Sequence, residues 1–294
     1  MLSILIPVYN YNIKSLISSL DKALNITDFD YEILCLEDGS TYHTEENKAI
    51  CISTDRASHL ISKNNNGRIT SRKALAQKSK YDWLLFLDAD VELKDKTLIE
   101  NYSKHFNHDC DAIYGGYMYK DFCPASKFML RWTYGNSFEQ VNAKKRNQSP
   151  YKVVISGNLL IKKETFLNLN SEIKSDGYGY DNIFGALMKE KNIKVLHINN
   201  AVFHNGLDEN PVFLTKVEHA VITLYNHYTS NKQQPTDNGL LELYKSMKKV
   251  GLHKAVALLF NLSKARIQKQ LLGKRPSMRL LQFYKLGYLS SLTH

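Results

Sequence analysis

Two aspartates separated by one residue are the clearest candidates for chemistry in this sequence. Asp88 and Asp90 directly follow the apolar run Trp83–Leu87, a pattern that predicts a buried central strand. Just past a strand end both carboxylates can point into one crevice, and burying them there without a cation would cost free energy. Hard oxygen ligands suit Mg²⁺ or Mn²⁺, which keep water and substrate phosphate as further ligands. The alternative is an exposed turn with solvated carboxylates.

A second polar cluster follows two earlier strand-like runs. Asp38-Gly39-Ser40 comes after Tyr31–Glu37, and Tyr9 comes after Leu2–Val8. An acid in this position could accept the imide N–H of a uracil, and the ring of Tyr9 could lie on the same base. The alternatives are an ordinary turn, in which Asp and Ser bond local amides, and a half-buried aromatic side chain.

Alternating strand and helix patterns in the first half must position these residues. The expected strands are Leu2–Val8, Tyr31–Glu37, Ser58–Ser62, Trp83–Leu87 and Ala112–Tyr119. The expected helices between them are Ile13–Leu24, Ile69–Ser79 and Thr97–Phe106, the last with Asp95 as its N-cap. This alternation predicts an α/β fold with a Rossmann-like, mainly parallel central sheet flanked by helices. Ligands bind such sheets beyond the carboxyl ends of the strands, where the polar clusters lie.

The second half of the chain is less regular. The patterns predict strands at Lys152–Ile155, Asn158–Lys162, Lys194–Ile198 and Ala201–His204. A turn-rich segment, Asp176–Asp181, opens a predicted helix that runs to Lys191. From Pro211 onward the chain is predicted to be helical, with breaks near Pro235–Gly239 and Gly273–Pro276.

The positive charge is concentrated at one end of the chain. The net charge is +10, from 39 Lys and Arg against 29 Asp and Glu, and residues 245–294 hold 11 of the basic residues and no acidic ones. Residues 1–244 therefore carry 28 basic and 29 acidic side chains. An enzyme of nucleic acids would spread basic surface around its cleft, and the tail offers no aromatic platform for bases, so we expect no nucleic-acid partner.

The basic tail also has an amphipathic pattern. Within Leu252–Leu272 one predicted helical side carries Leu252, Ala255, Val256, Leu259, Leu262 and Ile267. The cations Lys254, Lys264, Arg266 and Lys269 lie largely away from that side. Basic amphipathic helices suit an anionic membrane surface. Equally, these helices could pack on the rest of the protein and expose a cationic outer face.

Composition indicates a globular protein, with 43% hydrophobic and 23% charged residues. The chain opens on a strand-like run, and no apolar stretch of about 18 residues occurs in it. The cysteines Cys35, Cys51, Cys110 and Cys123 form no C-x-x-C pair, which predicts buried thiols in a reducing compartment. We therefore expect a cytoplasmic protein, at most peripheral on the inner face of the cytoplasmic membrane.

Four motifs in order carry a family resemblance. They are Ser3–Asn10, Glu32–Thr41, Asn66–Arg72 and Trp83–Asp90. Together they resemble a family-2 inverting glycosyltransferase of GT-A fold. The resemblance is strong over residues 1–120, and it continues more thinly through Val154–Asn158, Tyr178–Asn182 and Val202–His204.

The resemblance implies a nucleotide-sugar site. Pro7, Tyr9 and Asp38 would hold the base, and Arg72 would lie near the base or the diphosphate. The first acid of the usual Asp-Asp pair is Glu37 here, and Lys73 stands where an Asn is common.

The remaining implied roles concern the diphosphate, the metal and the sugar. Asp88 would meet the ribose or the metal, while Asp90 and His204 would bind a divalent cation, Mn²⁺ or Mg²⁺. Gly157 would lie along the donor sugar, because glycine permits close backbone approach.

The catalytic base is implied by a Gly-x-Glu-Asp element that opens a helix in the family. This sequence reads Gly179-Tyr180-Asp181-Asn182, so Tyr180 stands where Glu is usual. Asp181 is the expected base, with Asp176 as the second choice. Alternatively, Asp181 only caps the helix that follows.

The activity implied is metal-dependent, inverting transfer of a hexosyl or N-acetylhexosaminyl group from a nucleotide-sugar, expected to be UDP-linked. The acceptor would be a saccharide or a lipid-linked saccharide in bacterial surface-polysaccharide synthesis. Residues 1–210 would form the catalytic domain, with a donor half at about 1–120 and an acceptor half at about 121–210. Residues 211–294 would form a helical, basic extension.

Two other functions stay open at this point. A sugar-phosphate nucleotidyltransferase would be expected to have a Gly-rich phosphate loop after its first strand, which Pro7–Asn10 is not. The other is a non-catalytic nucleotide-binding protein at a membrane surface. Such a protein needs no catalytic base, so Tyr180 in the place of the usual Glu would be compatible with it.

Overall fold

The computed structural model describes residues 1–173, 177–231 and 237–292, and the chain forms two compact units. The first unit comprises residues 1–118, 141–176 and 192–206. The second comprises residues 119–140, 177–191 and 207–294. Residues 119–140 and 177–191 thus belong to the same compact unit as the C-terminal helices. Whether residue 210 separates a catalytic domain from an extension stays a prediction.

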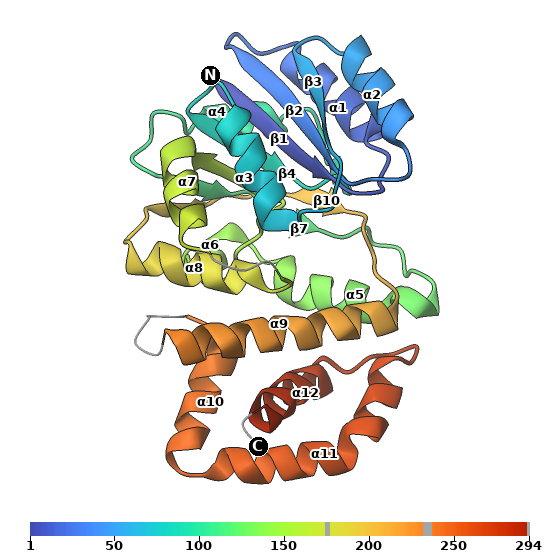
Figure 1. Ribbon diagram of the computed structural model, residues 1–294, viewed down its shortest axis with the longest axis vertical. Helices are drawn as coiled ribbons and strands as arrows, with labels where there is room; N and C mark the ends of the chain where they lie inside the picture. Colours follow the sequence, from blue (N-terminus) through green and yellow to red (C-terminus); the bar gives the residue numbers. More distant parts are fainter. Residues whose placement is uncertain (174–176, 232–236, 293–294) are drawn as a thin grey trace. The chain divides into compact units, whose positions relative to one another are not determined.

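The first unit is built on a seven-stranded sheet, ordered β3-β2-β1-β4-β8-β6-β9 within the described residues. Figure 1 labels the β3-β2-β1-β4 part of this order. Its strands are β1 (Leu2–Val8), β2 (Tyr31–Asp38), β3 (Ala57–Ser62), β4 (Trp83–Leu87), β6 (Ala112–Tyr114), β8 (Asn158–Lys162) and β9 (Val195–His197). Strands β1 to β4 run parallel, whereas β8 runs antiparallel to both β4 and β6. The prediction of an α/β fold with a mainly parallel sheet is confirmed.

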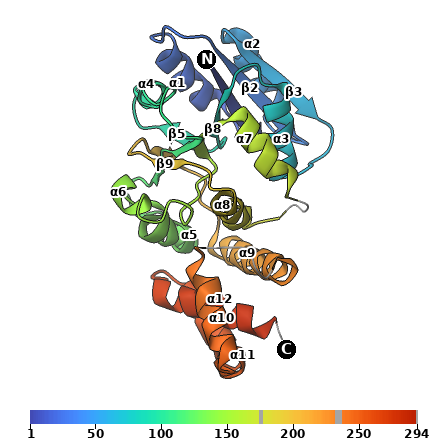
Figure 2. The ribbon, with the colours of Figure 1, turned by 90° about the vertical axis from the view of Figure 1, so that its left-hand side faces the viewer.

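Helices cover both faces of this sheet. The helices of the first unit are α1 (Lys14–Leu24), α2 (Thr44–Ser53), α3 (Arg68–Lys78), α4 (Leu98–Ser103), α6 (Ala143–Arg146) and α7 (Lys163–Ser171). Helices α1 and α4 pack together on one face, and α3 packs with α7 on the other (Figure 2). Strand β4 is fully apolar and buried because it lies at the centre of the sheet between β1 and β8.

A small second sheet brings distant segments to the end of β4. It pairs β5 (Val91–Leu93) with β10 (Val202–His204), and β10 in turn with β7 (Tyr117–Met118). The predicted strand Ala112–Tyr119 is wrong as one element: it divides between the two sheets at Gly115-Gly116, where Gly116 has a φ of +99°. His204 of β10 pairs with Val91 of β5, and Val91 is the residue directly after Asp90.

A buried arginine fixes the chain at this division between the sheets. Arg146 is 3% exposed, and its guanidinium donates to the carbonyls of Gly115 (3.0 Å) and Ile198 (2.7 Å). It also donates to Nδ1 of His197 at 2.8 Å. Because the groups that it bonds are neutral, burial lowers the pKa of Arg146 to about 10. These bonds join the point where the chain changes sheet to the segment that carries His197 and Ile198.

The second unit consists mainly of helices. They are α5 (Met129–Tyr134), which continues as a π-helical turn over Gly135–Glu139, and α8 (Tyr180–Glu190), α9 (Asn210–Ser230), α10 (Gly239–Lys249), α11 (Leu252–Leu271) and α12 (Met278–Ser291). Helix α12 packs against α9, α10 and α11, as Figure 1 shows. The helical character of the C-terminal region is confirmed. No helix in the described part of the chain is long and apolar enough to cross a bilayer.

Several local predictions are wrong. The segment Lys152–Ile155 is not a strand. The helix predicted at Thr97–Phe106 is shorter in the structure, where only α4 is helical. Its N-cap is Thr97 and not Asp95, which accepts the N–H and the hydroxyl of Thr97. Cys123 is exposed, whereas the other three cysteines are buried as predicted.

The imidazole of His197 should make stability depend on pH. His197 is 2% exposed, and burial, reinforced by the charge of Arg146, lowers its pKa to about 4. Unfolding restores a pKa near 6.5, so only the unfolded chain binds a proton as the pH falls from 6.5 toward 4. Lowering the pH from 7.5 to 5 should therefore reduce the free energy of unfolding by about 2 kcal/mol through this residue.

Urea unfolding of wild type and His197→Gln at both pH values measures this effect. The difference between the two pH values should be smaller in the variant by about that amount. The exposed His219→Gln is the matched control and should keep the wild-type difference. An unchanged pH response in His197→Gln would contradict the prediction.

Candidate active site

Asp88, at the carboxyl end of β4, is the centre of a charged cluster in the first unit. Its Oδ1 accepts a hydrogen bond from Arg72, and its Oδ2 accepts from Arg68 (2.9 Å) and from the hydroxyl of Tyr117 (3.0 Å). Burial opposes ionisation of this carboxyl, but the two guanidinium groups outweigh it and hold the pKa of Asp88 well below its usual range. Asp88 is therefore an ionised and firmly held carboxylate.

Helix α3 supplies both arginines. Arg68 and Arg72 are four residues apart, so their side chains project from the same helix face. Arg72 is 5% exposed and its guanidinium lies over the ring of Phe86, whereas the side chain of Arg68 is 45% exposed. Arg68 also donates to Oγ of Ser156 at 3.2 Å. Sequence reasoning selected Arg72 and missed Arg68, although the spacing of four could have indicated it.

Asp38 holds the loop that begins α3. Its Oδ1 accepts the backbone N–H of Asn66 (2.9 Å) and its Oδ2 accepts that of Gly67 (3.0 Å), the N-cap of α3. At Gly39, with a φ of +72°, an added Cβ would lie 2.4 Å from the backbone nitrogen of Asn65. Gly39 thus has the positive φ expected there, but Asp38 bonds distant amides instead of local ones, and its two oxygens fix the loop before α3.

The predicted base-binding residues lie at the ends of β1 and β2. The side chain of Asn10 joins these ends, because its Oδ1 accepts the N–H groups of Thr41 (2.7 Å) and Tyr42 (3.1 Å). The preceding residue, Tyr9, is 55% exposed, so its ring is available to a ligand. Pro7 lies within β1 itself and faces Leu36 of β2.

Glycine is required at position 157 by its neighbours in the fold. An added Cβ would lie 1.9 Å from the hydroxyl of Tyr117 and 2.2 Å from Oδ2 of Asp88. The carbonyl of Gly157 accepts the N–H of Asp88 at 3.2 Å. The close neighbours of Gly157 are thus Tyr117 and Asp88, and its place along a donor sugar stays a prediction.

Asp90 and His204 form a second pair next to Asp88. Nε2 of His204 lies 3.6 Å from Oδ2 of Asp90, and the backbone N–H of Asn205 donates to the carbonyl of Asp90 at 2.9 Å. Burial, reinforced by the charge of Asp88, raises the pKa of Asp90 although His204 opposes the shift. A half-buried carboxylate with this electrostatic penalty gains more from a cation than Asp88 does.

The residues fit a divalent cation. One carboxylate and one imidazole 3.6 Å apart can both reach one ion, and Mg²⁺ or Mn²⁺ is commonly held by one or two protein groups plus phosphate and water. An added Cβ at Gly206 would lie 1.7 Å from Oδ2 of Asp90, so this glycine keeps space beside the oxygen. Over residues 1–173, 177–231 and 237–292, no group of three or more His, Cys, Asp or Glu could hold a metal alone.

Asp181, the predicted base, belongs to the second unit. It lies in the first turn of α8, whose N-cap is Gly179, so the alternative that Asp181 caps the helix is wrong. Gly179 has a φ of +101°, and an added Cβ would lie 2.7 Å from Cα of Ala220 in α9. Asp181 is close enough to Tyr134 to help raise the pKa of that hydroxyl, after the larger effect of burial. The second choice, Asp176, lies outside the described residues.

The second unit also holds a buried polar network that sequence reasoning missed. The carboxylate of Glu139, in the π-helical turn, accepts from Arg131 (3.0 Å) and from the hydroxyl of Tyr119. Arg131 is 5% exposed, and its charge faces the rings of Tyr119 and Phe213. No motif links these residues in sequence, so only the fold identifies them as a group.

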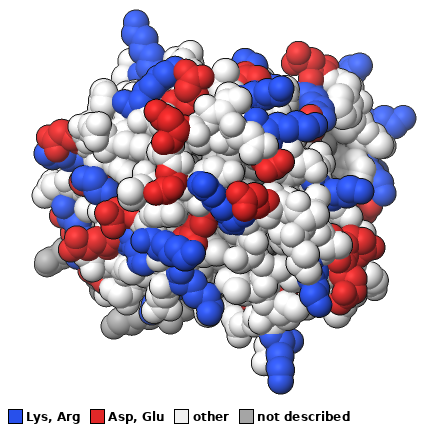
Figure 3. Space-filling view, turned by 90° about the horizontal axis from the view of Figure 1, so that it is seen from above, with Lys and Arg blue, Asp and Glu red and all other residues white. Residues whose placement is uncertain are grey.

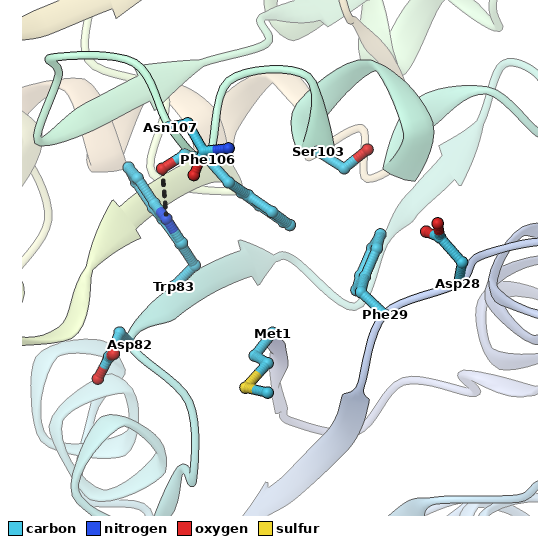
Figure 4. Close-up of a pocket in the computed structure, with 8 residues that line it drawn as sticks. All are labelled: Met1, Asp28, Phe29, Asp82, Trp83, Ser103, Phe106 and Asn107. Carbon is cyan, nitrogen blue, oxygen red and sulfur yellow. Dashed lines mark hydrogen bonds between the residues drawn. The ribbon is translucent and has the colours of Figure 1, made fainter.

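An open pocket lies away from the charged cluster, at the opposite edge of the large sheet. Met1 precedes β1 and Trp83 begins β4, so the pocket is at the amino ends of these strands (Figure 4). Its aromatic side chains contact one another: Phe106 stacks on Trp83 at 5.9 Å and meets Phe29 edge-on at 5.4 Å. None of the residues predicted for the nucleotide-sugar site lines it.

The surface in Figure 3 carries basic and acidic side chains side by side. Neither sign gathers into one continuous field on that face. This mixture agrees with the near balance of charge over residues 1–244.

Comparisons with known proteins agree with this geometry. The sequence model described as "Glycosyl transferase family 2" matches residues 3–168. A curated protein of Rickettsia bellii, an "uncharacterized glycosyltransferase", is 33% identical over 106 residues, which are 34% of this chain and 15% of that protein. The chain thus spans a small part of that relative's length.

Two solved glycosyltransferases share the fold at low identity. A mannosyltransferase of Pyrobaculum calidifontis, in complex with GDP-Man and Mn²⁺, superposes with a TM-score of 0.59 at 12% identity, covering 99% of this chain and 86% of that one. Glucosyl-3-phosphoglycerate synthase of Mycobacterium tuberculosis, in complex with Mn²⁺, UDP and glucosyl-3-phosphoglycerate, gives 0.51 at 13%, covering 81% of each chain. The arrangement of strands and helices is therefore the GT-A fold.

The two neighbouring carboxylates should respond differently to removal of their charge. Asp88→Asn would remove the charge that pairs with the buried Arg72 and should cost roughly 3 kcal/mol of unfolding free energy. Asp90→Asn should cost less than about 1 kcal/mol, because burial disfavours the charge that it removes. Urea unfolding of both variants measures the difference. Equal losses in the two would show that the arginines do not hold Asp88 as described.

Proposed function

The chain belongs to glycosyl transferase family 2 and is a glycosyltransferase, and on this premise we propose that it transfers a sugar from a UDP-sugar in a metal-dependent, inverting reaction. The observation that carries the proposal is the cluster of Asp88, Asp90 and His204 beside Arg68 and Arg72. It lies at the carboxyl end of the central strand, where α/β sheets bind their ligands. Family membership also removes the nucleotidyltransferase alternative.

The nucleotide would bind across the ends of β1 and β2. Tyr9 would lie on the base, and the carboxylate of Asp38 would accept its N–H while still holding the loop before α3. A carboxylate oxygen accepts more than one hydrogen bond, so both roles are compatible. Guanine also presents N–H donors, and one solved relative is a complex with GDP-Man, so a nucleotide panel must decide the base.

The diphosphate would lie beside the two arginines of α3. Arg68 is the more exposed of them and would turn toward a phosphate, whereas Arg72 would keep Asp88 in place for the ribose or the metal. Asp90 and His204 would hold the divalent cation. Such a cation supplies charge stabilisation for the departing β-phosphate. Mn²⁺ in both solved relatives supports this part of the proposal.

The donor sugar and the acceptor complete the proposal. The backbone at Gly157 would face the sugar, next to Asp88. Asp181 would take the proton of the attacking hydroxyl, and attack from the side opposite the diphosphate inverts the anomeric carbon. This role rests on the resemblance of Tyr178–Asn182 to the family's helix-opening element. The acceptor would be a saccharide or lipid-linked saccharide of a bacterial surface polysaccharide, met in the cytoplasm at the membrane.

Nucleotide binding is tested by thermal unfolding with UDP, GDP and CDP, each with and without Mn²⁺. A nucleotide at about 100 times its dissociation constant should stabilise the folded chain by roughly 2.7 kcal/mol. UDP should do so only with Mn²⁺, and Asp90→Ala should abolish the shift. The exposed Asp55→Ala is the control and should keep it. A shift by GDP and not by UDP would show that the bound base is guanine and not uracil. The absence of a shift with every nucleotide would overturn the proposed site.

Catalysis is tested by UDP release from UDP-hexoses and UDP-N-acetylhexosamines with saccharide and lipid-linked acceptors. Asp181→Asn should lower turnover by about 10²- to 10⁴-fold, the usual contribution of a general base, and leave the nucleotide-induced thermal shift intact. Glu190→Gln, an acid at the other end of α8, is the matched control. Full activity in Asp181→Asn would move the role to Asp176.

A further inference from the structure

The outer face of α11 carries exposed leucines. Leu258, Leu259 and Leu262 are 62%, 58% and 77% exposed, and Leu252 at the start of the helix is 55% exposed. Leu258 and Leu259 precede Leu262 by four and three residues, and Leu252 precedes Leu259 by seven, so all lie on one side of the helix over roughly 15 Å of its length. Leucines gathered in this way on a surface mark an interaction site, whereas single exposed leucines do not.

The opposite face of the same helix is the one that packs in the second unit. Ala257, Phe260, Ile267 and Leu271 are buried there. Phe260, Ile267 and Leu271 belong to a core cluster with residues of α9 and α12. The single apolar side predicted from Leu252 to Ile267 is therefore wrong, because Ile267 lies in the core and Leu252, Leu259 and Leu262 lie outside it. The helix thus has apolar side chains on both faces, and only one face is covered within the described residues.

Cations accompany the exposed leucines. Arg266 and Lys269 follow Leu262 at the same helical spacing, and Lys254 lies at the border of the face; all are exposed. Lys248 and Lys249, exposed at the end of α10, precede Val250, which is 68% exposed. Lys264 differs, because it points to Glu218 in α9, 3.9 Å away. Residues 245–294 contain no acidic side chain that could neutralise this surface.

We propose that this face of α11 docks on the surface of an anionic lipid bilayer, with Leu258, Leu259 and Leu262 entering the headgroup boundary. Leucines flanked by lysine and arginine are the combination that interfacial helices use, because apolar burial and attraction to anionic lipids add. The proposal deepens the proposed function, since it names the surface that would bring the enzyme to a lipid-linked acceptor. Only the purpose of the docking, access to that acceptor, rests on the proposed function.

Charge decides against a second copy of the chain as the occupant. In a two-fold symmetric dimer the same patch meets itself, so Lys254, Arg266 and Lys269 would face like charges across the contact. An anionic bilayer offers the opposite charge to all of them. Nucleic acid would also attract the cations, but it would give the leucines nothing apolar to contact.

Flotation with lipid vesicles tests the proposal on the full chain. The vesicles are phosphatidylcholine alone or phosphatidylcholine mixed with phosphatidylglycerol. Wild type should float with the mixed vesicles, and Leu258→Ser/Leu262→Ser should bind them at least about tenfold more weakly, because two buried leucines are lost. The matched control is Ile26→Ser/Ile52→Ser, which alters side chains that are 67% and 74% exposed in the first unit, and it should bind like wild type.

A charge variant separates the two contributions. Lys254→Gln/Lys269→Gln should weaken binding to the mixed vesicles roughly thirtyfold, about fivefold for each cation, and leave binding to phosphatidylcholine unchanged. Raising the salt from about 0.1 M to about 0.5 M should weaken wild-type binding to the mixed vesicles in the same direction.

Three outcomes would overturn the docking surface. They are no flotation of wild type with either vesicle, an equal loss in the isoleucine control, and a wild-type dimer in light scattering that Leu258→Ser/Leu262→Ser converts to a monomer. The nucleotide-induced thermal shift is measured on the same preparations without vesicles. If that shift is present and flotation fails, the docking surface is wrong and the proposed transferase site stands.

Discussion

The structure of the candidate site depends on one interaction, the carboxylate of Asp88 held between Arg68 and Arg72. Through it the end of β4 is attached to α3, and through the hydroxyl of Tyr117 and the carbonyl of Gly157 it is attached to β7 and to the turn before β8. A buried guanidinium such as that of Arg72 needs an anionic partner, so the ion pair fixes the end of β4 against α3. The opening of α3 is in turn held by Asp38.

The different partners of two nearby carboxylates explain how they can have different roles. Asp88 has two guanidinium groups and a hydroxyl, and its pKa is lowered; Asp90 has an imidazole and a neighbouring negative charge, and its pKa is raised. The first carboxylate is thus satisfied by the protein, whereas the second carries an unfavourable charge that a cation would relieve. An Asp-x-Asp motif in sequence contains no sign of this difference, since it depends on which groups reach each oxygen.

Local patterns were sufficient where neighbouring residues decide the structure. The bounds of β1 and β4 are those that the apolar runs predict, and the parallel order follows from strand–helix alternation. They were insufficient where partners are distant in sequence. Arg146, 32 residues from Tyr114 and 51 from His197, binds at the point where a predicted strand divides between two sheets. Arg131 and Glu139 were missed for a related reason, because a π-helical turn brings them together without a periodic signature.

The same limit applies to α11, where periodicity identified an apolar side but could not say which apolar residues the fold would cover. Helix α12 and the N-terminal part of α9 take Phe260, Ile267 and Leu271 into a core, and the leucines three or four residues apart on the other side remain at the surface with Arg266 and Lys269. Leaving such a face in water forgoes the free energy of its burial, so the fold alone gives no reason for it. A reason must come from a partner, and an excess of basic residues confined to this region points to an anionic one.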